Sequence, residues 1–146
     1  MRGLLTLEES AVRVWCECLA HQCESGGGVQ HIARNGAPYL DRFYVGGWSP
    51  KNKTPGPAIF LHHFLASDSG TEVHSHPWAA VSLILAGGYY EHRCTPDGLE
   101  AHEYRPGDVN ILEPTTRHRI DLIGADCWTL FVCGEYRQPW MFGPLC

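Results

Sequence analysis

Two stretches of this chain decide its fold: residues 74–87, HSHPWAAVSLILAG, and residues 105–118, RPGDVNILEPTTRH. In the second stretch a tight Pro-Gly turn starts a strand, a proline breaks it, and His118 follows. In the first stretch His74 and His76 are alternate residues, and alternate side chains of an extended strand point to one face. Both imidazoles are therefore predicted to face one point. Imidazole is a good ligand for zinc, copper, iron and nickel.

From residue 39 onward, short apolar runs alternate with turn-forming residues. The runs read YLDRFYV, AIFLHHFL, AVSLILA, GYYEHR, DVNILE and CWTLFVC. The segments between them carry Gly, Pro, Asn or Asp, and a turn is expected at Gly87-Gly88. Many short strands at close spacing predict an all-β sandwich or barrel. One antiparallel barrel is therefore expected from about Tyr39 to Phe142.

The first residues follow a different pattern. Thr6 and Glu9 match a capping box, and helical spacing of apolar residues predicts a helix over residues 7–21. The helix is expected to pack on a larger body through the apolar stripe of Ala11, Val14, Trp15, Cys18 and Leu19. A run of three glycines then makes a flexible linker. The predicted division is therefore a helix and linker, residues 1–28, followed by a barrel domain, residues 29–146.

Residues 74–87 and 105–118 resemble the first and second motifs of the cupin superfamily, and the spacing of histidine and glycine fits in both. The resemblance implies an all-β fold: a cupin-type antiparallel β-barrel, also described as a double-stranded β-helix or jelly roll, with the short N-terminal helix outside it. It also implies one divalent transition metal. The implied metal ligands are His74, His76 and His118.

Ala80 departs from the first cupin motif, which usually carries a glutamate ligand at this position. The remaining three-histidine set is similar to those of thiol dioxygenases and of some ring- or diketone-cleaving dioxygenases, which use Fe(II). The resemblance thus implies a mononuclear non-haem Fe(II) dioxygenase that acts on a small polar molecule. Three histidines plus water also describe a catalytic zinc site. A non-redox isomerase or lyase using Zn, Mn or Ni, and a small-molecule-binding cupin without catalysis, therefore stay open.

Other candidate site residues flank the two motifs. Tyr89 and Glu91 share one strand face and are predicted to be catalytic, with Glu91 as a late carboxylate ligand or a general base. The competing interpretation, a solvated Glu91 on the outer face of the barrel, is favoured from the sequence. A wall histidine, an aromatic residue beside the ligands, an inward hydroxyl and an arginine are the candidates for substrate binding. These are His63, Trp78, Ser82 and Arg117.

The seven cysteines are an odd number, so at least one cannot pair within the chain. Glu8 and Glu9 lie where a signal peptide needs its apolar core, so no export signal is expected. Reduced thiols and a cytoplasmic location are the simpler interpretation. A short segment gathers metal-type residues at Cys16, Cys18, His21 and Cys23. Because Cys16 and Cys18 would point about 200° apart on a helix, a zinc site there is disfavoured.

Charge and hydropathy limit the partners. The net charge of −5 argues against nucleic acid, whose phosphates favour a basic face. No run of eighteen apolar residues exists, so no membrane-spanning helix is expected. Open sheet edges invite pairing, and a homodimer is predicted in which residues 28–45 cross to a second subunit. The expected partner of the site is a small-molecule substrate.

Overall fold

The computed structural model describes residues 8–68, 70–144 and 146, and these form one helix and nine strands. Every strand pairing is antiparallel, as the sequence predicted. The elements are α1 (Glu9–Ser25), β1 (Val29–Arg34), β2 (Ala37–Gly47), β3 (Ala58–Phe64), β4 (Val73–Ser75), β5 (Ala80–Thr95), β6 (Gly98–Tyr104), β7 (Val109–Leu112), β8 (His118–Cys133) and β9 (Met141–Gly143).

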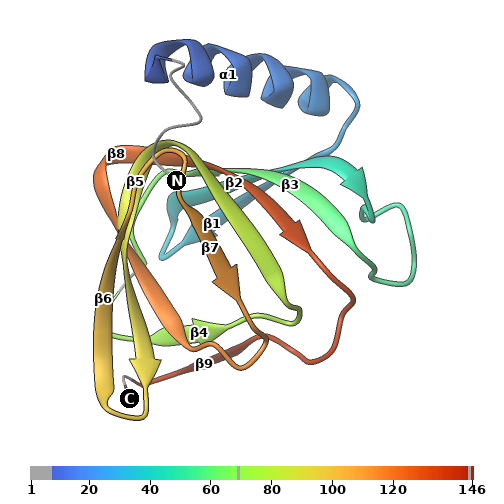
Figure 1. Cartoon of the computed structure of the whole chain (residues 1–146). Coiled ribbons are helices and arrows are strands. Elements are labelled where there is room, and N and C mark those ends of the chain that lie inside the picture. The colour runs from blue at the N-terminus through green and yellow to red at the C-terminus, as the bar shows by residue number, and fades with distance from the viewer. Residues whose placement is uncertain (1–7, 69, 145) are drawn as a thin grey trace.

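Two strands of 16 residues each, β5 and β8, organise the barrel. They pair along their length, from Ala80 opposite Cys133 to Arg93 opposite His118. The first half of β5 also pairs with β7, and its second half pairs with β6. Likewise the end of β8 pairs with β3, and its start pairs with β4. The sheet therefore curls into two halves joined through β5 and β8, as Figure 1 shows.

The prediction of a turn at Gly87-Gly88 is wrong, because strand β5 continues through both residues. The pairing with β8 shifts register on both sides of Gly87, which marks β-bulges. Gly87 has a φ of 76°, and a Cβ atom there would collide with the carbonyl oxygen of Asp126. Glycine is therefore needed for a bend and a close approach within a strand, not for a chain reversal.

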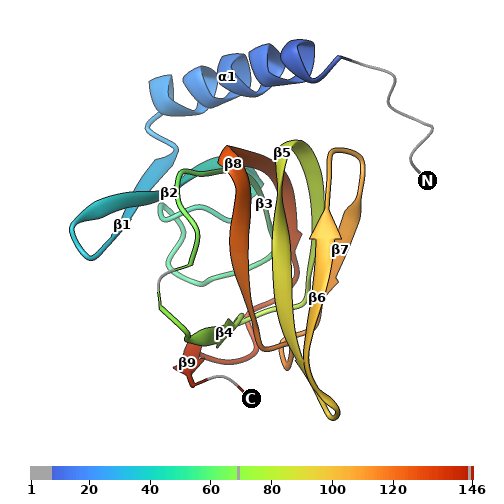
Figure 2. The ribbon, with the colours of Figure 1, turned by 90° about the vertical axis from the view of Figure 1, so that its left-hand side faces the viewer.

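The helix exists as predicted, but it begins at Glu9 and ends at Ser25. Its N-cap residue is Glu8, while Thr6 of the expected capping box lies outside the described residues. Figure 2 shows α1 at the end of the barrel opposite to β4 and β9. None of the helices among the described residues has the length and apolar character needed to cross a membrane.

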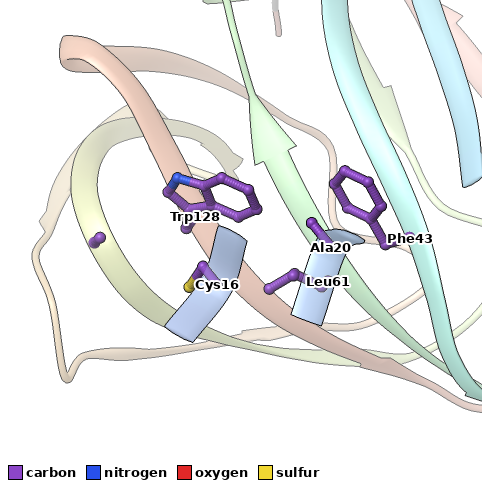
Figure 3. Packing of buried hydrophobic residues seen from close by; sticks show 6 residues of the cluster. Cys16, Ala20, Phe43, Leu61 and Trp128 are labelled. Carbon is purple, nitrogen blue, oxygen red and sulfur yellow. The ribbon is translucent and has the colours of Figure 1, made fainter. Parts of the chain in front are cut away.

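The prediction of the buried face of the helix is mostly wrong, because most residues of the predicted apolar stripe are exposed. Val14 is 59% exposed and Trp15 is 51% exposed, and Cys18 is also exposed. The buried positions are instead Cys16 and Ala20, four residues apart on one helical face. They pack on three side chains from the outer face of the sheet, shown in Figure 3: Phe43, Leu61 and Trp128. Two apolar faces compete on this helix, and contact with the sheet decides which is buried.

One pair of cysteines contradicts the prediction of reduced thiols, because Cys94 and Cys146 form a disulfide. It ties the segment after β9 to the end of β5. Cys127 and Cys133 are buried free thiols, as expected for small apolar side chains. The helix thiols Cys16 and Cys18 differ in burial, which agrees with the divergence predicted for them.

Residues 28–45 lie within the sheet of their own chain. β1 pairs with β2, and β2 pairs with β3. β1 forms one edge of the sheet, and an unpaired sheet edge offers backbone groups to a strand of another chain. The homodimer stays a prediction.

Candidate metal centre and cavity

Three buried histidines meet inside the barrel, at the end away from α1. His74 lies on β4, His76 follows that strand, and His118 starts β8 directly opposite His74. Their ring centroids are 4.7–5.1 Å apart. One nitrogen from each lies within 4.8 Å of the others, a spacing that lets the three reach one metal ion. The predicted convergence of these three residues is therefore present in the structure.

The orientation of His118 is set by Glu91 on β5. Nδ1 of His118 donates to Oε1 of Glu91 at 2.6 Å. Nε2 of His118 is buried and has no hydrogen-bond partner among the described residues, so this nitrogen is available to a metal. A carboxylate that holds the second nitrogen of a ligand imidazole is a regular feature of metal sites. The arrangement fits a bound divalent metal.

Glu91 is fully buried, which contradicts the favoured interpretation of a solvated side chain on the outer face. It also accepts hydrogen bonds from Arg93 at 3.0 Å and Asn110 at 3.2 Å. Burial raises its pKa, but the hydrogen bond from His118 and the charge of Arg93 outweigh this and bring the pKa to about 2. Because Glu91 contacts Nδ1 of His118, it lies across the imidazole from Nε2. It is therefore not placed as a fourth metal ligand.

Asp68 stands behind His74 in a similar way, with its Oδ2 3.7 Å from Nδ1 of His74. Burial, followed by the nearby His118, lowers the pKa of His74 to about 4. The same two causes hold the pKa of His76 well below its ordinary value. Both imidazoles are therefore neutral at pH 7 and offer a lone pair to a metal.

A cavity of about 450 Å³ opens beside the three histidines. Besides the three histidines, three more of the residues predicted for the site line it, namely Tyr89, Trp78 and Ser82. Glu91 is not among the lining residues. No aspartate or glutamate is among them either, so the described wall of the cavity carries no negative side chain.

Two predicted substrate-binding residues lie elsewhere. His63 faces the helix side of the sheet, where its ring stacks on Trp128 at 3.8 Å and its Nε2 bonds Asp126 at 2.7 Å. Its neighbour His62 lines the cavity instead, because adjacent residues of a strand point to opposite faces. Arg117 is not a lining residue, and its Nη2 donates to the carbonyl oxygen of Pro144.

Sequence reasoning missed the cavity wall formed by β1, β2 and the segment around β9. β2 contributes Arg42, and the segment ending in β9 contributes Trp140 and Phe142. The sequence signal that could have found this wall is the strand alternation in residues 39–45, which places Leu40 and Arg42 on one face of the strand. The sequence alone did not say which face was the inner one.

Several solved structures share this architecture. HppE with Fe(II) and the alternative substrate (S)-1-HPP is 10% identical with a TM-score of 0.57, and the match covers 72% of this chain and 54% of that chain. The chain thus spans about half the length of HppE. KdgF from Halomonas sp. is 18% identical with a TM-score of 0.53, covering 73% and 90% of the two chains. The nucleoside dehydratase Pac13 from Streptomyces is 12% identical with a TM-score of 0.55, covering 82% and 88%.

No family model and no curated protein sequence matches the chain. At identities of 10–18%, the likeness to these three structures concerns the fold alone. That likeness agrees with the two sequence motifs, the antiparallel curled sheet and the three converging histidines. The chain therefore has the cupin fold.

Proposed function

We propose that this chain is a metal-dependent cupin enzyme, and more narrowly a mononuclear Fe(II) dioxygenase that acts on a small polar molecule. The observation that carries the proposal is the neutral donor set: three buried imidazoles converge, and the described cavity wall holds no carboxylate. His74, His76 and His118 would hold the metal, and a neutral set leaves it with its full charge and open positions. Bound Fe(II) would supply the redox chemistry for O₂.

Tyr89 is the lining residue best placed to exchange a proton with a substrate. Its hydroxyl oxygen accepts a hydrogen bond from Nδ2 of Asn110 at 3.1 Å. Burial raises the pKa of Tyr89 far above neutrality, so the hydroxyl stays protonated. Its proton is not used in a hydrogen bond with any described residue and can be donated into the cavity. Glu91 would act differently, by holding His118 in the ligand orientation.

The structural matches support a metal-dependent enzyme without choosing the reaction. HppE was solved with Fe(II) bound, which favours iron as the metal in this proposal. A non-redox reaction is the second candidate, because the match to the dehydratase Pac13 extends over 88% of that chain. In this second case a metal would serve as a Lewis acid.

The experiment compares iron and zinc in the same protein. The chain is stripped with a chelator and reloaded without oxygen with either Fe(II) or Zn(II), and metal content is measured by emission spectrometry. O₂ uptake is then followed with a panel of small polar compounds. We expect uptake with iron and none with zinc. Turnover that proceeds with zinc and without O₂ would overturn the dioxygenase proposal and support the second candidate.

A matched pair of variants controls for nonspecific metal. His118→Ala should lose the metal, because one of the three imidazoles is gone. His31→Ala removes an exposed imidazole that also pairs with a carboxylate, Asp41, at 2.6 Å, and should keep the metal. Unchanged metal content in His118→Ala would overturn the assignment of the centre.

A further inference from the structure

The cavity contains a cation that the metal centre does not explain. Arg42 on β2 lies opposite His62 on β3, and both side chains line the cavity. Nε of Arg42 donates to Nε2 of His62 at 3.1 Å, and its guanidinium carbon is 4.9 Å from the centre of the Phe60 ring. Burial, with a smaller contribution from Arg42, keeps the pKa of His62 well below its ordinary value. Arg42 is thus held by a neutral imidazole and an aromatic face.

Arg42 has no acidic partner within 4.0 Å among the described residues. The other arginine of the cavity wall differs in this respect. Arg34 forms an ion pair with Asp68 at 2.7 Å, and its guanidinium lies 3.9 Å from the centre of the Tyr39 ring. A partly desolvated charge without a partner is costly for folding. Such a cost is typical of a group that serves a ligand.

We propose that Arg42 binds the anionic group of a small organic substrate in this cavity, a carboxylate or a phosphonate. The inference rests on the proposed function, in which the same molecule reaches the metal. Because Nε is used by His62, the N–H groups of the Nη nitrogens that Tyr44 does not occupy remain for the ligand. A guanidinium presents its N–H groups as a planar fork that matches two oxygens of such an anion.

The geometry of the wall indicates how far the substrate extends. The ring of Phe131 lies 4.9 Å from that of His62 and 6.0 Å from that of the metal ligand His76. A single aromatic ring therefore separates the anion site from the metal centre along this wall. A short apolar body fits beside Phe131, and a second polar group would reach the metal. The cavity volume of about 450 Å³ is in the range of small-ligand sites.

Electrostatics favour the same class of ligand. A divalent metal on three neutral imidazoles keeps its full positive charge, and Arg42 adds another. The carboxylates nearest to the centre, Glu91 and Asp68, lie behind ligand histidines and are paired with Arg93 and Arg34. The cavity is therefore complementary to an anion and unfavourable to a cation.

The test measures binding instead of turnover. Zinc-loaded protein is titrated by calorimetry with benzoate and with its neutral isostere benzamide, then with lactate and lactamide, and finally with phenylphosphonate. Wild type should bind at least one anion about 10- to 100-fold more tightly than its amide, as expected for hydrogen bonds to a charged group. The comparison of benzoate with phenylphosphonate identifies which anionic group is preferred. Equal binding of every acid and its amide would overturn the proposal without relying on any variant.

Variants assign the effect to Arg42. In Arg42→Gln the preference for the anion should fall to within about twofold, with zinc content and circular dichroism unchanged. Arg42→Lys keeps the charge without the fork and should restore part of the preference. Arg105→Gln changes an exposed arginine paired with Glu103 and should leave the preference intact. A full preference in Arg42→Gln would overturn the assignment.

Metal content separates this inference from the proposed function. If the protein takes up no metal, yet metal-free wild type still prefers anions in an Arg42-dependent way, the proposed function fails and the anion site stands. If zinc loads normally and the preference is absent, the anion site fails and the metal centre stands.

Discussion

Replacing Glu91 with glutamine tests whether a buried carboxylate orients His118, one of the proposed metal ligands. The substitution keeps the size of the side chain and removes its charge. In the wild type, Oε1 of Glu91 faces Nδ1 of His118 at 2.6 Å and also accepts from Arg93 and Asn110. The amide of the variant must turn its oxygen toward His118 to keep that bond, and a neutral acceptor makes the bond weaker.

The expected loss is about 10-fold in metal affinity, or about 1.4 kcal/mol, at the low end of the range known for residues that hold metal ligands. Glu91→Ala removes the acceptor altogether and should approach about 100-fold. The barrel should stay folded in both variants, because Arg93 keeps its bonds to Oδ1 of Asn110 and to the carbonyl oxygen of Ile111. The measurement is a zinc competition titration against a chromophoric chelator, with circular dichroism to check folding.

The control is Glu100→Gln on β6, where a glutamate also stands beside a histidine. Its carboxylate is 3.7 Å from Nε2 of His102, and both side chains are 57% exposed. This variant should bind zinc as the wild type does. An affinity of Glu91→Gln within twofold of the wild type would refute the idea that Glu91 controls the ligand orientation.

Three further changes probe the ligands, the helix contact and the disulfide. His76→Ala should remove the metal by emission spectrometry while the barrel stays folded, and full retention would contradict its role. Burial raises the pKa of Asp126, but the hydrogen bonds from His63 and from Arg13 on the helix outweigh burial, so the pKa is lowered. Asp126→Asn should therefore lower the free energy of unfolding, measured with urea at pH 7, by about 1 kcal/mol. The wild type loses this stabilisation as the pH falls through the lowered pKa of Asp126, so the difference between the two proteins should shrink at low pH. A difference that stays the same at low pH would contradict this account. Cys94→Ser opens a loop with a sequence separation of 52 to Cys146 and should lower the free energy of unfolding by up to about 4 kcal/mol, a difference that should vanish in reductant.

The convergence of the three histidines, the proposed metal ligands, was predictable because it depends largely on local geometry. His74 and His76 are alternate residues of an extended segment, so their side chains point the same way, although β4 itself ends at Ser75. His118 could be added because the proline-bounded strand before it resembles a known motif. The alternation of short apolar runs likewise gave the antiparallel class. These inferences need no knowledge of which strands become neighbours.

The cavity wall could not be predicted because it depends on pairing between distant segments. Arg42 and His62 are twenty residues apart in sequence, and they meet through the register of β2 with β3. The pair His62-His63 shows the same limit, since alternation separates the two but does not say which one faces inward. The disulfide of Cys94 with Cys146 also joins segments whose proximity only the closed barrel reveals.

Glu91 was misplaced for a reason that lies within β5 itself. Ser82 lines the cavity, so continued alternation would put even-numbered residues inside along the whole strand. The register shifts around Gly87 change this parity, and Ala86 packs in the cluster under the helix. Beyond the bulges, the odd-numbered Tyr89 and Glu91 face inward, where Glu91 lies across from Ile120 and diagonally next to His118. The bulges reverse which side chains of β5 face inward, and they thereby bring the carboxylate of Glu91 behind His118. Ala80 lies before the bulges, where the strand offers no carboxylate to the proposed metal.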